Sequence, residues 1–222
     1  EEMNEDNRYQ VFNHTISMVE GEFADSYDSM IEKFQCFGDD AIFGLLFPYI
    51  ESGQEMLDIG IGTGLGSCRF GKPGLEIDGM DISGEMLDQC GSKGFARDLK
   101  IHDMTVLPYP YEDRTYDHVI SVGTFHFFKD LRPIFKEAGR ILKDGGKFTF
   151  TVMSDRDGGP VEGPTMHHTR WGKDVVPHGR DYVERILEET GFRKLKWLLF
   201  LGSIDPEDGV KSYYWGFVAE KV

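Results

Sequence analysis

Three glycines that follow a short apolar run form the stretch best suited to chemistry. The run Met56–Ile59 predicts a buried strand, and Gly60, Gly62 and Gly64 come directly after it in the sequence DIGIGTG. Glycine has no side chain to keep a ligand away from the backbone, and it tolerates a positive φ. The start of a helix just beyond would offer unpaired N–H groups to a carboxylate or a phosphate. The stretch therefore predicts a strand-turn-helix unit whose backbone contacts a cofactor.

The spacing of the glycines separates two classes of cofactor. The dinucleotide pattern G-x-G-x-x-G/A puts Leu65 at its last position when counted from Gly60, and Ser67 when counted from Gly62. Neither register fits the pattern well. The observed D-x-G-x-G-x-G, which starts at Asp58, instead resembles the first motif of class I S-adenosylmethionine (SAM)-dependent methyltransferases. An ordinary glycine-rich turn is the alternative interpretation of this stretch.

The resemblance implies a fold and a cofactor. The fold is a Rossmann-like α/β domain, with a seven-stranded and mostly parallel sheet, a C-terminal antiparallel hairpin and helices on both faces. The chain ends accordingly, because 194–201 and 211–219 read as two strands joined by a short turn, and such neighbours pair antiparallel. The implied cofactor is SAM, and the residues at the motif positions are Asp58, Gly60, Gly62, Thr63 and Gly64.

A carboxylate is expected at the end of the second strand. Asp81 closes the strand predicted over 75–82 and lies 23 residues beyond Asp58, close to the spacing at which such a carboxylate reaches ribose hydroxyls. A helix cap is the alternative role for Asp81, although Ser83 is better placed as the cap. We therefore expect Asp81 to bind the ribose of the cofactor.

Two further segments resemble adenosine-binding segments of the same family. Asp103 and Met104 follow the strand predicted over 99–102, and the resemblance implies that the Asp103 carboxylate accepts from the adenine amino group. An Asx turn before a proline-rich loop is the alternative for Asp103. Ile82 and Met86 belong to the stretch DISGEML, whose equivalents lie near the adenosine. All four residues are expected to contact the cofactor.

The fourth strand, predicted over 116–122, should end beside the reacting groups, because open α/β sheets bind ligands at the carboxyl ends of their strands. Ser121, Gly123 and His126 lie at this end and match the family's fourth-strand exit, which implies cofactor contacts from the first two. His126 is the one titratable group here and is the candidate base for the acceptor. The alternative is a histidine that packs against Phe127.

Two N-terminal helices should lie over the cofactor. They are predicted over 22–35 and 39–51, the second capped by Asp39. Tyr27 and Asp28 resemble a pair whose tyrosine contacts the methionine part of SAM. A tyrosine packed in a helical core is the alternative.

A long loop without clear periodicity follows the fifth strand and is rich in glycine and proline. Its residues Met166, His167, His168 and Trp171 predict a lid that closes over the acceptor. The two histidines are adjacent and share no helix face, so a metal site is not predicted.

The length of 222 residues predicts a single methyltransferase domain. Its expected parts are an N-terminal helical cap at 1–52, a SAM-binding core at 53–152, a substrate lid at 153–178, and a C-terminal helix and hairpin at 179–222.

Charge and composition limit the partners. The formal net charge is −15 and no lysine or arginine run is present, which excludes nucleic acid as the expected partner. No apolar run approaches the roughly 18 residues that span a bilayer, so no membrane partner is expected.

The chain starts with acidic residues and without the features of a signal peptide, which favours a cytoplasmic location. Three widely spaced cysteines indicate neither a disulfide framework nor a zinc site.

These patterns together predict a SAM-dependent methyltransferase that acts on a small-molecule acceptor. Nucleic-acid methylation is disfavoured because neither an N-P-P-Y-like run after the fourth strand nor a Pro-Cys nucleophile is present. Two alternatives stay open: a SAM-binding sensor or partner subunit without catalysis, and a nucleotide-dependent oxidoreductase. The glycine register and the terminal hairpin disfavour the oxidoreductase.

Overall fold

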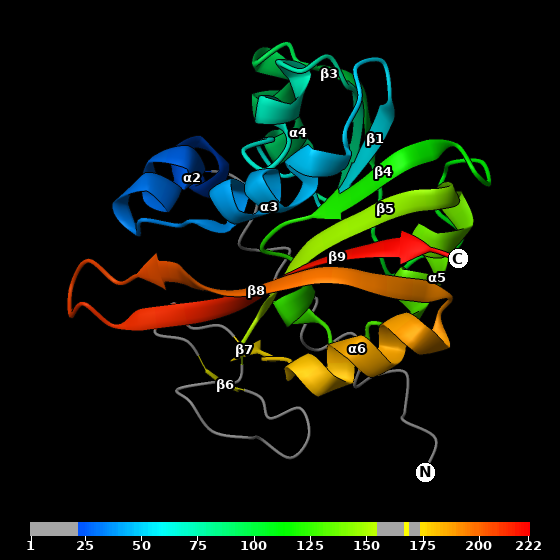
Figure 1. Cartoon of the computed structure of the whole chain (residues 1–222). Coiled ribbons are helices and arrows are strands. Elements are labelled where there is room, and N and C mark those ends of the chain that lie inside the picture. The colour runs from blue at the N-terminus through cyan, green and yellow to red at the C-terminus, as the bar shows by residue number, and fades with distance from the viewer. Residues whose placement is uncertain (1–21, 155–166, 169–173) are drawn as a thin grey trace.

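Helices and strands alternate along the chain in the computed structural model, which describes residues 22–154, 167–168 and 174–222 (Figure 1). The elements in chain order are α2 (Glu22–Lys33), α3 (Gly38–Leu46), η1 (Phe47–Tyr49), β1 (Glu55–Ile59), η2 (Cys68–Gly71), β2 (Glu76–Asp81), α4 (Gly84–Ser92), β3 (Ala96–Ile101), β4 (Tyr116–Ser121), η3 (Phe125–Phe127), α5 (Arg132–Ile141), β5 (Leu142–Met153), β6 (His167–His168), β7 (Asp174–Val175), α6 (Arg180–Glu189), β8 (Phe192–Ile204) and β9 (Lys211–Lys221). The three η elements are short 3-10 helices.

Seven of the described strands form one sheet in the order β3-β2-β1-β4-β5-β9-β8. The first five strands are parallel, and β9 pairs antiparallel with both β5 and β8. The predicted mostly parallel sheet with a C-terminal antiparallel hairpin is confirmed. The strand order reverses between β1 and β4, and such a reversal opens a crevice at the carboxyl ends of these two strands.

The centre of the sheet is buried on both faces, since the side chains of β1 and β4 alternate between the two faces and nearly all of them are buried. Leu57 of β1 lies in an apolar cluster with α5 and α6, whereas its neighbour Met56 lies in a cluster with α3. Val119 and Ile120 of β4 divide in the same way. Helices therefore cover both faces of the sheet, as predicted.

The second N-terminal helix is shorter than predicted. The helix expected over 39–51 ends at Leu46 and passes into the single turn η1, because Pro48 has no N–H to continue the helical hydrogen bonds. Asp39 is not its cap. Phe37 occupies the N-cap position without a side-chain hydrogen bond, and Asp39 lies in the first turn, where a negative charge is favourable.

The sequence predicts a helix over 131–143 that Asp130 caps and Gly145 stops, and the boundaries of α5 differ from this prediction. Asp130 is not the N-cap, which is Leu131, although its Oδ1 accepts a hydrogen bond from the Arg132 N–H at 3.1 Å. The helix ends at Ile141 rather than near Gly145, because β5 begins at the next residue and pairs there with β4. Pairing with the sheet therefore sets this boundary.

The predicted lid at 153–178 falls largely outside the described residues, and Met166 and Trp171 lie there. The described part is not without secondary structure, since β6 and β7 pair antiparallel as a two-stranded sheet. Its closure over an acceptor stays a prediction, as does the division of the chain into four parts. Within the described ranges, no helix is both long and apolar enough to cross a membrane.

Candidate functional site

A cavity of about 490 Å³ lies at the carboxyl ends of β1, β2 and β4. Residues of α2 and of the far end of the β8–β9 hairpin also line it, and Figure 1 shows both on the same side of the molecule. The cavity brings together most of the predicted site residues: Tyr27, Asp58, Gly60, Gly62, Thr63, Asp81, Ile82, Met86, Met104, Gly123 and His126. Gly64, Asp103 and Ser121 are not among its lining residues.

The glycine turn presents bare backbone to this cavity. Gly60 and Gly62 have φ values of 74° and 55°, in the left-handed region that favours glycine. A Cβ atom on Gly60 would lie 2.9 Å from the Thr124 side chain, whereas one on Gly62 would meet nothing within 4 Å. The Gly62 N–H donates to Asp81 Oδ2 at 2.8 Å, which ties the turn to the end of β2. The backbone at Gly62 is therefore held in place beside open space.

Gly64 and Ser121 do not line the cavity but hold neighbouring elements in position. A Cβ on Gly64 would lie 2.5 Å from the Phe95 ring and 2.8 Å from Cys90 Sγ, so glycine permits close packing there. The Ser121 hydroxyl donates to the Ile59 carbonyl at 2.8 Å and joins β4 to β1. The short helix expected after the glycines is present as η2, a 3-10 helix of four residues that begins at Cys68.

Asp81 ends β2 and lines the cavity. Its Oδ2 accepts from Gly62 N–H, and its Oδ1 accepts from Ser83 N–H at 3.0 Å. A carboxylate can accept about four hydrogen bonds, so Asp81 keeps acceptor capacity for a ligand beside these backbone N–H groups. Burial raises the pKa of Asp81, and the backbone N–H groups oppose this rise. Ser83 is the N-cap of α4 and accepts from Met86 N–H at 3.2 Å, so Asp81 is not needed as the cap.

Asp58 is the buried carboxylate at the end of β1, only 2% exposed. Its Oδ1 has no hydrogen-bond partner among the described residues. Burial raises the pKa of Asp58 from 3.8 to about 8; the neighbouring Ser67 hydroxyl opposes this rise, and the nearby charges of Asp39 and Asp81 add to it. Leaving a buried acceptor without a hydrogen bond costs free energy, so a hydrogen-bond donor of a ligand would stabilise this oxygen.

The predicted adenine-binding segment divides into two parts. Asp103 adopts the Asx turn that was its alternative, since its Oδ1 accepts from the Thr105 N–H and the Thr105 hydroxyl, both at 2.7 Å. Its neighbours His102 and Met104 line the cavity instead. The adenine-binding role of Asp103 stays a prediction that its position does not support.

A polar network ties α2 to the glycine turn. The Thr63 hydroxyl donates to Asp28 Oδ1 at 2.6 Å, and Lys93 Nζ bridges Asp28 Oδ2 and the Thr63 carbonyl at 2.6 and 2.8 Å. Tyr27 precedes Asp28 and lines the cavity, where burial raises its pKa. The helix thus lies over the cavity, as expected for the N-terminal part.

His126 lies in η3, directly after the fourth parallel strand, and lines the cavity. It is 8% exposed, and its Nδ1 has no hydrogen-bond partner in the described part of the chain. Its ring centroid lies 4.3 Å from that of Phe127 and 5.9 Å from that of Tyr214. Burial, assisted by the nearby His178, lowers the pKa of His126 from 6.5 to about 3. The ring is therefore uncharged at neutral pH, and its role as a base stays a prediction.

The family model of a methyltransferase domain matches residues 57–150. This range contains the glycine turn, the end of β2 and η3, which are the parts that build the cavity. The chain carries a methyltransferase domain over these residues, and its fold is that of solved SAM-dependent methyltransferases. SAM is accordingly its cofactor.

Three relatives show how far the similarity of this methyltransferase extends. An uncharacterised protein of Methanocaldococcus jannaschii is 28% identical over 176 residues, which cover 78% of this chain and 80% of that protein. The malonyl-[acyl-carrier protein] O-methyltransferase of Geobacter sulfurreducens is 29% identical over 70% of this chain and 61% of its own. The solved structure of the Haemonchus contortus phosphoethanolamine N-methyltransferase 2, with phosphomonomethylethanolamine and S-adenosylhomocysteine, has a TM-score of 0.63 at 20% identity. That match covers 82% of this chain and 52% of the nematode chain, so the chain spans less than two thirds of the latter two proteins.

The C-terminal hairpin of the methyltransferase is a part of the cavity that the sequence did not reveal. Phe37 N–H donates to the Gly202 carbonyl and Ile204 N–H donates to the Phe34 carbonyl, both at 2.9 Å, which joins the end of α2 to β8. A Cβ on Gly202 would lie 2.0 Å from the Tyr214 ring, so glycine allows this ring to lie flat on β8. The hairpin contributes the lining residues Phe200, Gly202, Ser203, Asp205, Asp208, Val210, Ser212 and Tyr214.

The strand lengths were the missing signal. The sequence predicts strands over 194–201 and 211–219, whereas β8 and β9 contain 13 and 11 residues. Strands of this length extend beyond the five- or six-residue strands β1, β2 and β4 beside the cavity. The excess length places the end of the hairpin at the cavity.

Metal ligands were not predicted for this methyltransferase. Across residues 22–154, 167–168 and 174–222, no group of three or more His, Cys, Asp or Glu side chains is arranged to hold a metal ion.

Replacement of Asp81 tests the predicted ribose contact. We expect Asp81→Ala to weaken SAM binding by about 1.5–3 kcal/mol, or about ten- to 150-fold in Kd, because hydrogen bonds to a charged acceptor are lost. Calorimetric titration measures the change. Asp88→Ala is the matched control, since it removes an exposed carboxylate of α4 that does not line the cavity. Unchanged affinity in a folded Asp81→Ala protein would rule out the contact.

Proposed function

We propose that this methyltransferase transfers the methyl group of SAM to a small-molecule acceptor. The observation that carries the proposal is a single cavity that joins the glycine turn to η3 and to the hairpin, which leaves room for an acceptor beside the cofactor. The solved Haemonchus contortus relative supports this class of acceptor, since its structure contains the small molecule phosphomonomethylethanolamine. A cytoplasmic location stays a prediction.

The lining residues suit SAM, which is positively charged at its sulfur atom. Asp58 Oδ1 is the buried acceptor without a partner, and it would accept a hydrogen bond from the ammonium group of the cofactor. Asp81 would accept from the ribose hydroxyls, and the apolar Ile82, Met86 and Met104 would lie against the adenosine. When bound, SAM supplies a methyl group that a nucleophile of the acceptor attacks in line. The residues of the chain hold the two reactants in position and exclude water, which is the main source of rate enhancement for such a transfer.

The raised pKa of Asp58 predicts that SAM binding releases a proton. Asp58 has a pKa of about 8 and is mostly protonated at pH 7 in the ligand-free protein, and a neighbouring positive charge lowers that pKa. We therefore expect binding at pH 7 to release about 0.5–1 proton from this group, and affinity to increase with pH up to about 8. Calorimetry in buffers with different ionisation enthalpies measures the release.

Asp58→Asn is the control for this measurement, because it keeps an acceptor oxygen but cannot ionise. Protons released from SAM itself contribute to both proteins, so the difference between them reports Asp58 alone. Equal proton release from the native protein and the variant would contradict the raised pKa.

A turnover screen tests the proposed function directly. The protein is incubated with SAM and a library of small metabolites, and S-adenosylhomocysteine is quantified. Formation above the acceptor-free rate, absent when the protein is omitted, supports the proposal. SAM binding without product from any acceptor class would instead favour the sensor or partner subunit.

A further inference from the structure

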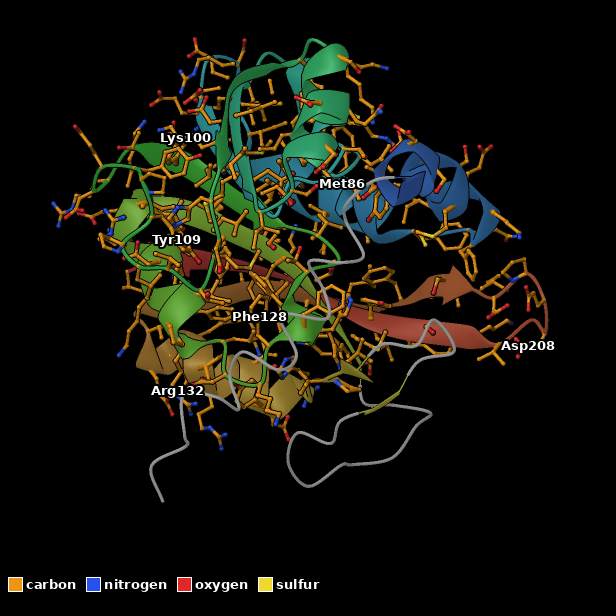
Figure 2. All side chains as sticks on the ribbon, turned by 180° about the vertical axis from the view of Figure 1, so that it is seen from behind. Met86, Lys100, Tyr109, Phe128, Arg132 and Asp208 are labelled. Atoms are coloured by element: carbon orange, nitrogen blue, oxygen red, sulfur yellow. The ribbon has the colours of Figure 1, made fainter. Side chains whose placement is uncertain are left out.

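Asp39 lines the cavity, although the sequence predicts only a helix cap at this position. It lies in the first turn of α3 and is partly buried. Figure 2 shows Met86, a lining residue from α4, beside the N-terminal helices and away from Asp208 at the tip of the hairpin. A Cβ atom on Gly66 would lie 3.7 Å from Asp39 Oδ1, so this carboxylate lies against the segment that follows the three glycines. Asp39 therefore belongs to the cofactor side of the cavity.

Asp39 lies within electrostatic reach of Asp58. Ser67 follows Gly66, and its hydroxyl lies beside Asp58, where it opposes the rise in pKa that burial causes. The charge of Asp39 adds to that rise. It also adds to the rise that burial causes in the pKa of Tyr27. The two carboxylates thus act on the same part of the cavity, next to the tyrosine that is expected to contact the methionine part of SAM.

No ion pair satisfies Asp39 among the residues that the structure describes. The positive charges that act on it are those of Arg69 and Lys93, which form ion pairs with Asp40 and Asp28 instead. Burial raises the pKa of Asp39 from 3.8 to about 6, and these two charges only partly oppose the rise. The carboxyl group is still mostly ionised at pH 7, so it keeps a negative charge beside the cavity.

The neighbouring carboxylate has an oxygen without a partner. Asp58 is 2% exposed, and its Oδ1 has no hydrogen-bond partner in the described part of the chain. Two carboxylates that share a site disfavour ionisation of each other, and a cation between them stabilises both. An ammonium group suits this position, because it combines a positive charge with three N–H donors. No lysine or arginine is among the described lining residues, so a ligand is the expected source of the charge.

We propose that Asp39 binds the ammonium group of SAM together with Asp58, so that α3 takes part in cofactor binding. The inference adds a cofactor-binding residue to the proposed function and rests on the contact proposed there between Asp58 and this ammonium group. Asp39 would then help the enzyme to distinguish a cofactor with a charged amino group from one that lacks the charge.

Replacement of Asp39 by asparagine tests this role, because asparagine keeps the size of the side chain and removes its charge. The probes are S-adenosylhomocysteine and its analogue with a hydroxyl in place of the amino group, which keeps the adenosine, the sulfur and the carboxylate. In calorimetric titrations at pH 7, we expect Asp39→Asn to weaken binding of S-adenosylhomocysteine about tenfold and binding of the hydroxyl analogue about twofold or less. The native protein should bind S-adenosylhomocysteine about tenfold or more tightly than the analogue.

Asp40→Asn is the matched control for a role of Asp39 in the helix alone. Asp40 belongs to the same first turn of α3, so each variant removes one favourable negative charge from the start of this helix. Asp40 is exposed and does not line the cavity. We therefore expect the two variants to have similar midpoints of thermal unfolding without ligand, and Asp40→Asn to keep both affinities within about twofold of the native values.

The outcomes distinguish this inference from the proposed function. Equal losses for both probes in Asp39→Asn, or the same loss of S-adenosylhomocysteine affinity in Asp40→Asn, overturn the inference and assign Asp39 a structural role. A selective loss for S-adenosylhomocysteine in Asp58→Asn but not in Asp39→Asn overturns the inference and leaves the proposed contact of Asp58 intact. Equal affinities of the native protein for the two probes contradict both contacts. None of these titrations needs an acceptor, so failure of the turnover screen would contradict the proposed methyl transfer alone.

Discussion

Replacement of His126 by asparagine should lower the turnover number by about 10²–10⁴-fold and leave SAM affinity within about twofold. His126 lies at the exit of β4, is almost fully buried and lines the cavity beside the proposed acceptor position. Asparagine keeps a hydrogen-bonding group of similar reach but has no basic ring nitrogen to accept the proton of the acceptor during transfer. The loss should therefore appear in the rate of methyl transfer, measured in single-turnover experiments with saturating SAM.

The pH dependence of the native enzyme gives an independent check on His126. Burial lowers its pKa to about 3, so the ring is neutral and able to accept a proton or a hydrogen bond from about pH 4 upward. We therefore expect that titration of His126 causes no step in kcat/KM near pH 6.5. A step caused by His126 would be present in the native enzyme and absent from His126→Asn. Such a step would contradict the lowered pKa. Turnover that is unchanged in the variant at every pH would instead assign His126 a packing role against Phe127.

Replacement of Phe150 by alanine should lower the free energy of unfolding by about 3–5 kcal/mol, the range for removal of a buried phenylalanine. Phe150 is fully buried in β5, and its ring centroid lies 4.6 Å from Phe148, 4.8 Å from Phe135 and 5.5 Å from Phe217. Alanine would leave a void that these rings cannot all fill, because they come from three different elements. Urea denaturation measures the loss.

Phe47→Ala is the matched control for the Phe150 experiment. Phe47 is 52% exposed, so the same change should alter the free energy of unfolding by about 0.5 kcal/mol or less. Similar losses in both variants would contradict a core centred on the β5 rings.

The neighbouring Thr151 accepts from Gly123 N–H at 2.9 Å, so Phe150→Ala should also weaken SAM binding through the end of β4.

Local sequence patterns were sufficient to predict the conformation of the glycine turn and the position of Asp81 at the end of a strand. The positive φ of Gly60 and Gly62 follows from residue type, and the position of Asp81 follows from its place at the end of a strand. Parallel pairing of β1 with β2 and β4 then brings these strand ends together. Such features depend on a few adjacent residues, and the sequence therefore predicts them well.

Features set by distant contacts could not be predicted in the same way. Asp39 and Asp130 have the residue type of a helix cap, yet the N-caps are Phe37, two residues before Asp39, and Leu131, one residue after Asp130. Residue type alone therefore does not fix where a helix begins. Asp103 bonds to Thr105, and the sequence pattern fits this turn and an adenine contact equally well. The acceptor side depends on how far the hairpin extends, which no local pattern specifies.

The order in which the chain is made has a consequence for the hydrogen bonds between α2 and β8. These two bonds join residues 34 and 37 to residues 204 and 202, so they close a loop of about 165 residues. In addition, β8 reaches the sheet only through β9, the last of the described strands. Contacts of such long sequence separation form slowly, whereas the βαβ units around the glycine turn are local. We therefore expect the methyltransferase to acquire its cofactor side first during synthesis, and the acceptor side only after β9 has left the ribosome.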